Sequence, residues 1–263
     1  MSYFSRLAAR SDAVGSLVCV GLDPDYRRHD AANVASYLQA VIHATAPYAA
    51  CFKPNIAFFE QFGMDGLRAL EQTLQAIPSG IPVIGDVKRG DIANTAEAYA
   101  RAMFERWGFD AVTLSGYQGL DTVAPFLSYP DRGVYVLCRT SNPSAREFQE
   151  LRLANGRQLF EEVALVATSW GANVGLVVGA TAPDELARVR RLVPTAPLLI
   201  PGVGTQGGRP EDVVAAAGYE PGLMVVNASR SIIYASEGAG FAEAAGLAAR
   251  QLRDQLATAP SRA

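Results

Sequence analysis

Charged side chains of opposite sign alternate in the segment D-V-K-R-G-D, which spans residues 86–91. Asp86 and Lys88 are two residues apart, so on an extended strand both side chains point to the same side. Lys53 lies in a separate apolar run, C-F-K-P-N-I-A-F-F, where a lysine is rarely buried without a partner. Because a lysine held among carboxylates stays protonated, it is available as a general acid. The pattern therefore predicts a site in which these three side chains place positive charge and a proton beside a substrate.

Two simpler interpretations of these residues stay open on the sequence alone. Asp86 and Lys88 could form an ordinary solvated ion pair at the end of a strand. Asp91, which directly precedes a helical pattern, could be the N-cap of that helix. Either interpretation leaves the residues concerned without a chemical role.

A second group of residues, late in the chain, has the composition of a phosphate site. The segment P-G-V-G-T-Q-G-G spans residues 201–208, and N-A-S-R-S spans residues 227–231. Glycines let backbone N–H groups approach an anion closely, and the Arg230 guanidinium can bind phosphate through two parallel hydrogen bonds. The alternatives are a plain flexible glycine turn and the dinucleotide fingerprint G-x-G-x-x-G. That fingerprint requires an acidic residue at the end of the next strand, where this chain has Asn227.

The elements that must position these residues alternate between short apolar runs and longer helical patterns. We expect strands at Leu17–Leu22, Ala50–Ile56, Ile81–Val87, Ala111–Leu114, Val134–Leu137, Val174–Val178, Leu198–Ile200 and Leu223–Val226. We expect helices at Asn33–Ala46, Leu67–Ile77, Ile92–Trp107, Leu120–Leu127, Gly156–Trp170, Pro183–Leu192, Arg209–Ala217 and Phe241–Leu256. The strands are apolar throughout, which is typical of a parallel sheet covered on both faces. Eight such units in 263 residues predict an α/β protein with a single (β/α)8 TIM barrel domain over residues 1–263.

A barrel of this kind brings the two groups of residues to one end. The active site of a TIM barrel lies at the C-terminal ends of the strands. Polar residues end the first three apolar runs, and the loops after the seventh and eighth strands are where barrels hold a phosphate. The sequence therefore predicts one site with a charged reaction end and a phosphate end.

The composition argues against several other functions. With 23 basic and 26 acidic side chains the chain has no basic footprint for nucleic acid. Two histidines, His29 and His43, cannot build a His-rich metal site. The three cysteines lie far apart in apolar runs, as expected for buried free thiols of a cytoplasmic protein. We find no signal-peptide pattern and no apolar stretch long enough to span a bilayer, so we expect no membrane association.

The segment D-V-K-R-G-D-I resembles the D-x-K-x-x-D-I signature of the orotidine 5′-phosphate decarboxylase family. The resemblance extends over most of the chain, through V-G-L-D-P-D, F-K-P-N-I-A-F-F-E, P-G-V-G-T-Q-G-G and N-A-S-R-S-I-I-Y. The segments K-P-N, R-G-D-I-A-N-T and V-L-C-R-T-S-N-P-S are similar to those of its longer, type 2 subgroup. Related sugar-phosphate enzymes share D-x-K-x-x-D alone, but all these segments in order indicate this family.

This resemblance implies a homodimeric barrel, free of cofactor and metal, that carries out the last step of de novo pyrimidine synthesis. The reaction converts orotidine 5′-monophosphate (OMP) to uridine 5′-monophosphate (UMP) and carbon dioxide. Lys88 would protonate the carbanion left at C6 of the pyrimidine, and Asp86 would lie beside the departing carboxylate. Lys53 and Asp91 would complete the charged array.

The resemblance also implies which residues bind the substrate. They are Asp23 and Asn55 at the ribose; Gln206, Arg230 and the backbone N–H of Ser229 at the phosphate; Pro201 along the base; Thr140 or Ser141 at the pyrimidine; and Asp91, Ile92 and Thr95 reaching the substrate of the other subunit. The glycine-rich loop Val203–Gly208 would be a lid.

Three other functions remain as alternatives. A magnesium-dependent sugar-phosphate decarboxylase or synthase of the same superfamily would stabilise an enediolate on the metal. A Schiff-base aldolase would need Lys53 or Lys88 as a neutral amine, which neighbouring carboxylates disfavour. A barrel that only binds a phosphorylated ligand would have no reason to keep the charged set.

Overall fold

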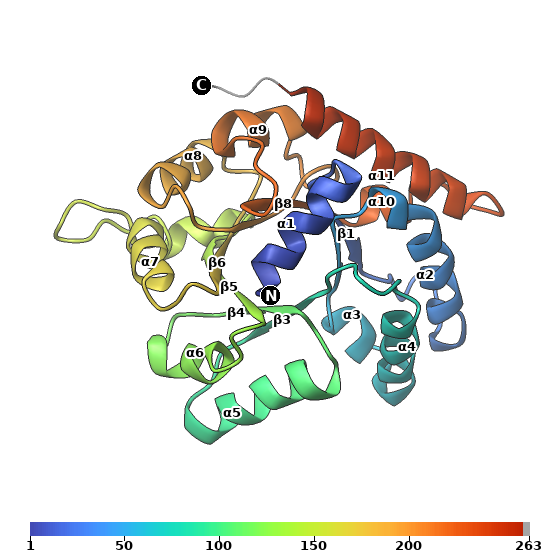
Figure 1. Cartoon of the computed structure of the whole chain (residues 1–263), viewed down its shortest axis with the longest axis horizontal. Coiled ribbons are helices and arrows are strands. Elements are labelled where there is room, and N and C mark those ends of the chain that lie inside the picture. Colours follow the sequence, from blue (N-terminus) through green and yellow to red (C-terminus); the bar gives the residue numbers. More distant parts are fainter. Residues whose placement is uncertain (260–263) are drawn as a thin grey trace.

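Eight parallel strands form the centre of the protein in the computed structural model, which describes residues 1–259 (Figure 1). They are hydrogen-bonded in the order β2-β1-β8-β7-β6-β5-β4-β3, and isolated bridges Phe52↔Val83 and Asn55↔Asp86 join the two outer strands. The strands are β1 (Val18–Leu22), β2 (Cys51–Pro54), β3 (Ile84–Arg89), β4 (Ala111–Leu114), β5 (Gly133–Arg139), β6 (Val174–Val178), β7 (Leu198–Pro201) and β8 (Met224–Ala228). The predicted (β/α)8 TIM barrel is confirmed, and the last four residues of the predicted domain, 260–263, lie outside the described residues.

Helices surround the barrel, so each strand is covered on its outer face (Figure 1). They are α1 (Tyr3–Val14), α2 (Ala31–Thr45), α3 (Ala57–Glu60), α4 (Gly63–Gln75), α5 (Ala93–Arg101), α6 (Leu120–Leu127), α7 (Leu159–Thr168), α8 (Pro183–Leu192), α9 (Pro210–Ala217), α10 (Arg230–Ile233) and α11 (Phe241–Thr258). None of the described helices is long and apolar enough to cross a membrane.

Alternate residues of the strands form two separate apolar clusters. One cluster takes one residue from each strand and fills the barrel interior: Cys19, Cys51, Ile84, Ala111, Tyr135, Val177, Leu199 and Val225. The other packs against the helices, as Val18, Val20 and Leu22 of β1 do. Both faces of each strand are therefore buried, which explains why the strands read as continuous apolar runs.

All eight predicted strands are present, with ends that differ by a few residues. The third strand begins at Ile84 rather than Ile81 and continues to Arg89. The helix predicted from Gly156 begins at Leu159, because Gln158 and Glu161 form a capping box there. The helix predicted over Ile92–Trp107 is α5 followed by a π-helical turn, Ala102–Arg106. Helices α1, α3 and α10 are absent from the predicted set.

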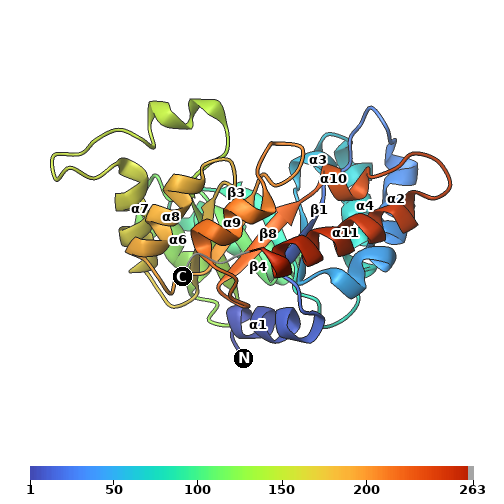
Figure 2. The same ribbon diagram turned by 90° about the horizontal axis from the view of Figure 1, so that it is seen from above.

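Helix α1 closes the end of the barrel at which the strands begin (Figure 2). Tyr3 and Leu7 are fully buried in the interior cluster, and the ring of Tyr3 meets that of Tyr135 edge to face at 6.0 Å. A Cβ at Gly133 would lie 2.3 Å from the Tyr3 ring, so this close approach requires glycine. With this end closed, the opposite end of the barrel is left for a site.

Candidate active site

A cavity of about 710 Å³ opens at the C-terminal ends of the strands, and we call it the reaction cavity. It gathers most of the predicted site residues: Asp23, Lys53, Asn55, Asp86, Lys88, Thr140, Ser141, Pro201, Gln206, Ser229 and Arg230. They come from the ends of β1, β2, β3, β5, β7 and β8 and the loops that follow. The two groups of residues that were expected to meet at one end of the barrel therefore line one cavity.

One carboxylate organises the charged end of the reaction cavity. Asp86 Oδ2 accepts a hydrogen bond from Lys53 Nζ at 2.7 Å, and its Oδ1 accepts one from Lys88 Nζ at 2.5 Å. Thr113 Oγ1 donates to Oδ1 at 3.0 Å, and Asn55 Nδ2 lies 3.4 Å from Oδ2. Lys53 is 3% exposed and Asp86 9%, whereas the side chain of Lys88 is 48% exposed. Lys88 is thus the cation of this group that a substrate can reach.

The two buried members of this group keep each other charged. Burial by itself lowers the pKa of a lysine, but Asp86 and Asp23 outweigh it and raise the pKa of Lys53 above its ordinary value. Burial likewise opposes ionisation of Asp86, yet Lys53 and Lys88 outweigh it and hold the pKa of Asp86 well below its usual range. Asp86 and Lys88 therefore do form an ion pair, but not an ordinary solvated one, because the carboxylate of Asp86 is buried and is shared with Lys53.

The backbone at Lys88 differs from the regular strand used to predict the site. Lys88 has φ +44°, and the pairing of β3 with β4 shifts between Gly85 and Arg89. A non-glycine residue in this region of φ is strained. Thr113 Oγ1 accepts hydrogen bonds from the N–H groups of Val87 and Lys88, at 3.0 and 3.1 Å, and stabilises the irregular turn. The convergence of Asp86 and Lys88 is correct, but a side chain of β4 enforces it rather than strand alternation.

Thr113 lines the reaction cavity and donates a hydrogen bond to Asp86, but sequence reasoning did not select it. Its only signal is a hydroxyl in the middle of the apolar strand A-V-T-L. The wall of the reaction cavity also contains apolar residues that were missed, among them Leu137, Val177 and Leu199. Their side chains carry no polar group that would distinguish them from other core residues.

Asp23 and Asn55, the two residues predicted to bind the ribose, directly follow the first two strands. Asp23 Oδ1 accepts a hydrogen bond from the N–H of Asn55 at 3.2 Å. Asn55 Oδ1 accepts one from the N–H of Ala57 at 3.1 Å, at the first residue of α3. These contacts orient both predicted ribose ligands toward the same space.

The residues predicted to bind phosphate combine a glycine-rich turn with the cation of Arg230. Gly202, Gly204 and Gly207 have φ between 85° and 103°, which only glycine adopts readily. Arg230 begins α10 and lines the cavity, and within residues 1–259 its guanidinium forms no ion pair. A Cβ at Gly21 would lie 2.6 Å from that of Ser229, so glycine there lets the loop approach β1. The arrangement can accept an anion without displacing a carboxylate.

Three predicted site residues, Asp91, Ile92 and Thr95, do not line the reaction cavity. Ile92 is 56% exposed and Thr95 is also exposed. Asp91 is half-buried, and among the described residues it forms no ion pair with Lys88. The N-cap of α5 is Ile92, and Asp91 Oδ1 accepts a hydrogen bond only from the adjacent N–H of that residue. The N-cap interpretation of Asp91 is therefore wrong.

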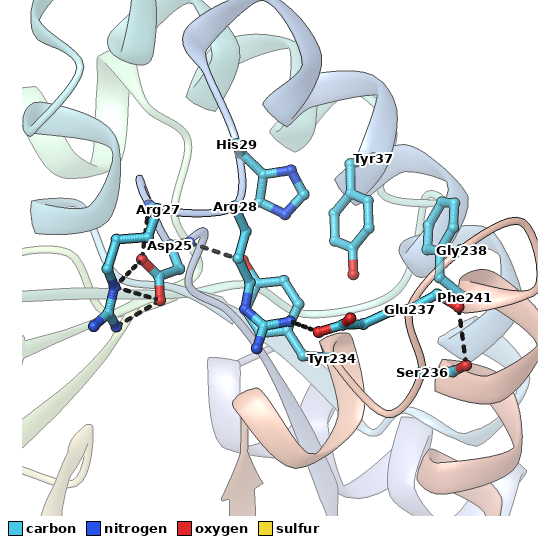
Figure 3. A pocket seen from close by; sticks show the side chains of 10 residues that line it. All are labelled: Asp25, Arg27, Arg28, His29, Tyr37, Tyr234, Ser236, Glu237, Gly238 and Phe241. Atoms are coloured by element: carbon cyan, nitrogen blue, oxygen red, sulfur yellow. Dashed lines mark hydrogen bonds and ion pairs between the residues drawn. The ribbon is translucent and has the colours of Figure 1, made fainter.

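A second cavity of about 680 Å³ lies beside the first and shares Asp25 and Arg27 with it (Figure 3). We call it the aromatic cavity, because His29, Tyr37, Tyr234 and Phe241 line it with their rings stacked or tilted against one another. Its other lining residues are Arg28, Ser236, Glu237 and Gly238. Nothing in the sequence pattern selected this group.

The described residues include no group of three or more histidine, cysteine, aspartate or glutamate side chains that could hold a metal ion. The three cysteines are buried and free, as predicted, and burial raises the pKa of Cys138 to about 12.

Known proteins resemble this chain along nearly its whole length. A family model described as the orotidine 5′-phosphate decarboxylase / HUMPS family matches residues 16–245. The chain is 48% identical over 252 residues to the orotidine 5′-phosphate decarboxylase of Herpetosiphon aurantiacus, covering 92% of this chain and 93% of that protein. It is 47% identical over 275 residues to that of Variovorax paradoxus, covering 98% and 99%. The structure of OMP decarboxylase from Leishmania donovani matches with a TM-score of 0.86 and 42% identity, covering 97% of this chain and 98% of that one.

Proposed function

The chain belongs to the orotidine 5′-phosphate decarboxylase family, and from this premise we propose how its reaction cavity converts OMP to UMP and carbon dioxide in pyrimidine biosynthesis. The observation that carries the proposal is the buried carboxylate of Asp86, held between Lys53 and the half-exposed Lys88. This group offers a fixed cation and a transferable proton at one point of the cavity.

Lys88 carries the reaction in this proposal. The bond between C6 of the pyrimidine and the carboxyl carbon breaks, carbon dioxide leaves, and the electron pair stays on C6. The Lys88 ammonium stabilises that charge and gives its proton to C6, after which the amine takes a proton from water. Asp86 lies beside the departing carboxylate and positions Lys88, while Lys53 keeps Asp86 ionised. The cation is in place before the charge develops, so the chemistry needs no cofactor.

The rest of the substrate extends from this group toward Arg230. We assign the ribose hydroxyls to Asp23 and Asn55, and the phosphate to Gln206, Arg230 and the N–H of Ser229. Pro201 lies along the base, and either Thr140 or Ser141 contacts the pyrimidine. The loop Val203–Gly208 closes over the phosphate as a lid, so that phosphate binding energy orients the distant reacting carbon.

We propose that a second copy of the chain supplies Asp91, Ile92 and Thr95 to each reaction cavity. This proposal is supported by the position of the three residues outside the cavity of their own chain, where Ile92 and Thr95 are exposed. An exposed isoleucine beside a half-buried carboxylate suits an interface. Mixing inactive Lys88→Ala and Asp91→Ala subunits should then restore part of the activity, because one cavity of each heterodimer is intact. Confirmed heterodimers without recovery would contradict the shared site. We also propose a cytoplasmic location, because free thiols persist in a reducing compartment.

The direct test is the ultraviolet absorbance change when OMP is added to the protein with a metal chelator present. We expect turnover at an undiminished rate. Loss of activity with the chelator, restored by magnesium, would instead support the sugar-phosphate alternative. Borohydride with substrate should trap no covalent adduct, because the raised pKa of Lys53 disfavours the neutral amine that a Schiff base requires.

A further inference from the structure

The segment after β5 carries the two hydroxyls, Thr140 and Ser141, either of which could contact the pyrimidine. The pairing of β5 with β6 ends at Arg139, whose carbonyl accepts a hydrogen bond from the N–H of Gly179 at 2.7 Å. Beyond this point the N–H of Thr140 bonds to a side chain, Gln149 Oε1, at 2.8 Å. Gln149 Nε2 in turn donates to Thr140 Oγ1 at 2.8 Å. The carboxamide of Gln149 thus binds both the N–H and the hydroxyl of Thr140, as a peptide group of a further strand would.

The hydroxyl of Thr140 is therefore already engaged. It accepts from Gln149 and donates its only proton to Asn142 Oδ1 at 2.6 Å. Ser141 Oγ, in contrast, reaches across the mouth of the reaction cavity and lies 3.0 Å from Gln206 Oε1 in the glycine-rich loop. Of the two hydroxyls, only that of Ser141 is held by the opposite wall of the cavity rather than by its own loop.

Ser141 is also fixed from behind. A Cβ at Gly179 would lie 3.0 Å from the Cα, Cβ and N of Ser141, so the glycine leaves room for this backbone. Thr181 Oγ1 donates to the carbonyl of Ser141 at 3.3 Å. The segment thus packs against the residues that follow β6, and Gln149 binds it on its other side.

Gln149 is itself anchored, so it can hold Thr140 in one place. Its N–H donates to the carbonyl of Ala145 at 2.8 Å, and its carbonyl accepts from the N–H of Phe160 in α7 at 2.9 Å. The next residue, Glu150, forms an ion pair with the buried Arg139 at 2.7 Å. The side chain of Gln149 does not line the reaction cavity and acts only through Thr140.

We propose that Gln149 is a positioning residue for recognition of the pyrimidine. By binding the N–H and the hydroxyl of Thr140, Gln149 keeps the Thr140 hydroxyl bonded within its own loop. The Ser141 hydroxyl is then the one presented to the base. This inference rests on the proposed function, because it takes OMP and UMP as the ligands of the cavity. It deepens that function by naming which hydroxyl reads the base and what holds it there.

The test compares inhibition of OMP turnover by UMP with inhibition by ribose 5-phosphate, which lacks the base. Gln149→Leu should weaken inhibition by UMP about tenfold, the effect of losing roughly one hydrogen bond, and leave that by ribose 5-phosphate unchanged. Gln149→Glu should restore most of the UMP inhibition, because a carboxylate oxygen still accepts the N–H of Thr140. Asn155→Ala, which removes a 3.2 Å bond to Glu162 elsewhere in the same loop, is the matched control and should change neither constant.

A second pair of variants keeps the test informative if Gln149→Leu folds poorly. Ser141→Ala should weaken UMP inhibition about tenfold, and Thr140→Val should weaken it less than threefold. In the Ser141→Ala background, adding Gln149→Leu should have little further effect on UMP, since both changes remove the same contact.

Several results would overturn the inference. They are unchanged UMP inhibition in Gln149→Leu, an equal loss for UMP and ribose 5-phosphate, a larger effect of Thr140→Val than of Ser141→Ala, and losses that multiply in the double variant. Failure of the proposed function is a separate result, because the unaltered protein would then neither turn over OMP nor bind UMP.

Discussion

The reaction cavity and the aromatic cavity lie side by side and both contain cations and carboxylates, but they pair them differently. In the aromatic cavity each arginine has its own carboxylate: Arg28 pairs with Glu237 at 3.0 Å, and Arg27 pairs with Asp25 at 2.7 Å where this cavity adjoins the reaction cavity. Hydrogen bonds from Arg27 hold the pKa of Asp25 at about 2. In the reaction cavity one buried carboxylate, Asp86, serves two lysines, and the phosphate end has an arginine with no ion-pair partner among the described residues.

The difference shows what prepares a charged pocket for chemistry. Ion pairs that reach solvent contribute about 0–1 kcal/mol to stability and leave little charge for a ligand. A buried pair costs several kcal/mol of desolvation per ion, roughly balanced by mutual attraction. The two cations of the reaction cavity that a ligand can reach, the half-exposed Lys88 and Arg230, are therefore available to an anionic substrate. Four substitutions test this contrast.

The largest effect is expected from Lys88→Ala. Removing the proton donor and the cation nearest the reacting carbon should lower kcat by at least about a thousandfold. The decrease in OMP absorbance measures this rate, and circular dichroism checks that the barrel is intact. If the variant keeps a tenth of the activity, Lys88 is not the proton donor of the reaction.

Asp86→Asn should cause the largest loss of stability. It leaves the buried ammonium of Lys53 without its counter-ion, which costs about 3–5 kcal/mol of unfolding free energy. Urea denaturation measures the loss, with Glu237→Gln in the aromatic cavity as the matched control. An equal loss of unfolding free energy in the two variants would contradict the difference between the cavities.

The pH dependence of this stability difference follows from the two shifted pKa values. The lowered pKa of Asp86 gives a contribution that is complete above the unfolded value of about 3.9 and is lost as pH falls through the folded value. The raised pKa of Lys53 gives one that is complete below about 10.4 and is lost as pH rises through the folded value. The difference between wild type and Asp86→Asn should therefore be constant from about pH 5 to 9 and decrease in acid. Urea denaturation midpoints of both proteins, measured across this range and in acid, check this pH dependence.

Arg230→Ala should affect activity far more than folding. The Arg230 guanidinium has no ion-pair partner to lose among residues 1–259, so the unfolding free energy should change by less than about 0.5 kcal/mol. Loss of the phosphate contact should lower kcat/KM about a hundredfold, because charge-assisted hydrogen bonds are stronger than those between neutral groups. Steady-state kinetics with OMP decides, and an unchanged kcat/KM would contradict the phosphate assignment.

The smallest effect is expected from Arg28→Ala in the aromatic cavity. It removes an exposed ion pair with Glu237 and a stacking contact with the ring of Tyr234 at 4.7 Å. We expect a stability loss of about 1 kcal/mol and an unchanged kcat/KM. A tenfold loss of kcat/KM would show that the aromatic cavity takes part in the reaction.

The sequence predicted the barrel because burial on both faces of each strand leaves a continuous apolar run. It also predicted the polar residues at the strand ends, since these interrupt the apolar pattern. Helix α1 was missed, although it closes the barrel, because its buried face is only Tyr3, Leu7 and Ser11. Helices α3 and α10 are single turns of four residues, too short for a helical period.

Within the site, residue types were predictable and contacts were not. The apolar surroundings of Lys53 predicted that it needs a partner, and Lys53 was expected to converge with Asp86 and Lys88. The pairing of Asp86 with Lys88, however, depends on the positive φ of Lys88 and on the hydroxyl of Thr113 from another strand. The hydrogen bonds that engage Thr140, on which the proposed choice of Ser141 rests, come from Gln149, nine residues further along the chain.

The amino-acid sequence by itself determined which side chains are charged, which segments are buried, and that the strand ends carry lysine, aspartate and arginine. These properties follow from local composition and period. Only the tertiary structure decided that Lys53 is buried against Asp86, that Lys88 stays open to the cavity, and that Asp91 lies outside it. The physical reason is that closing the barrel sets distances between residues far apart in the chain, and burial and pKa shifts depend on those distances.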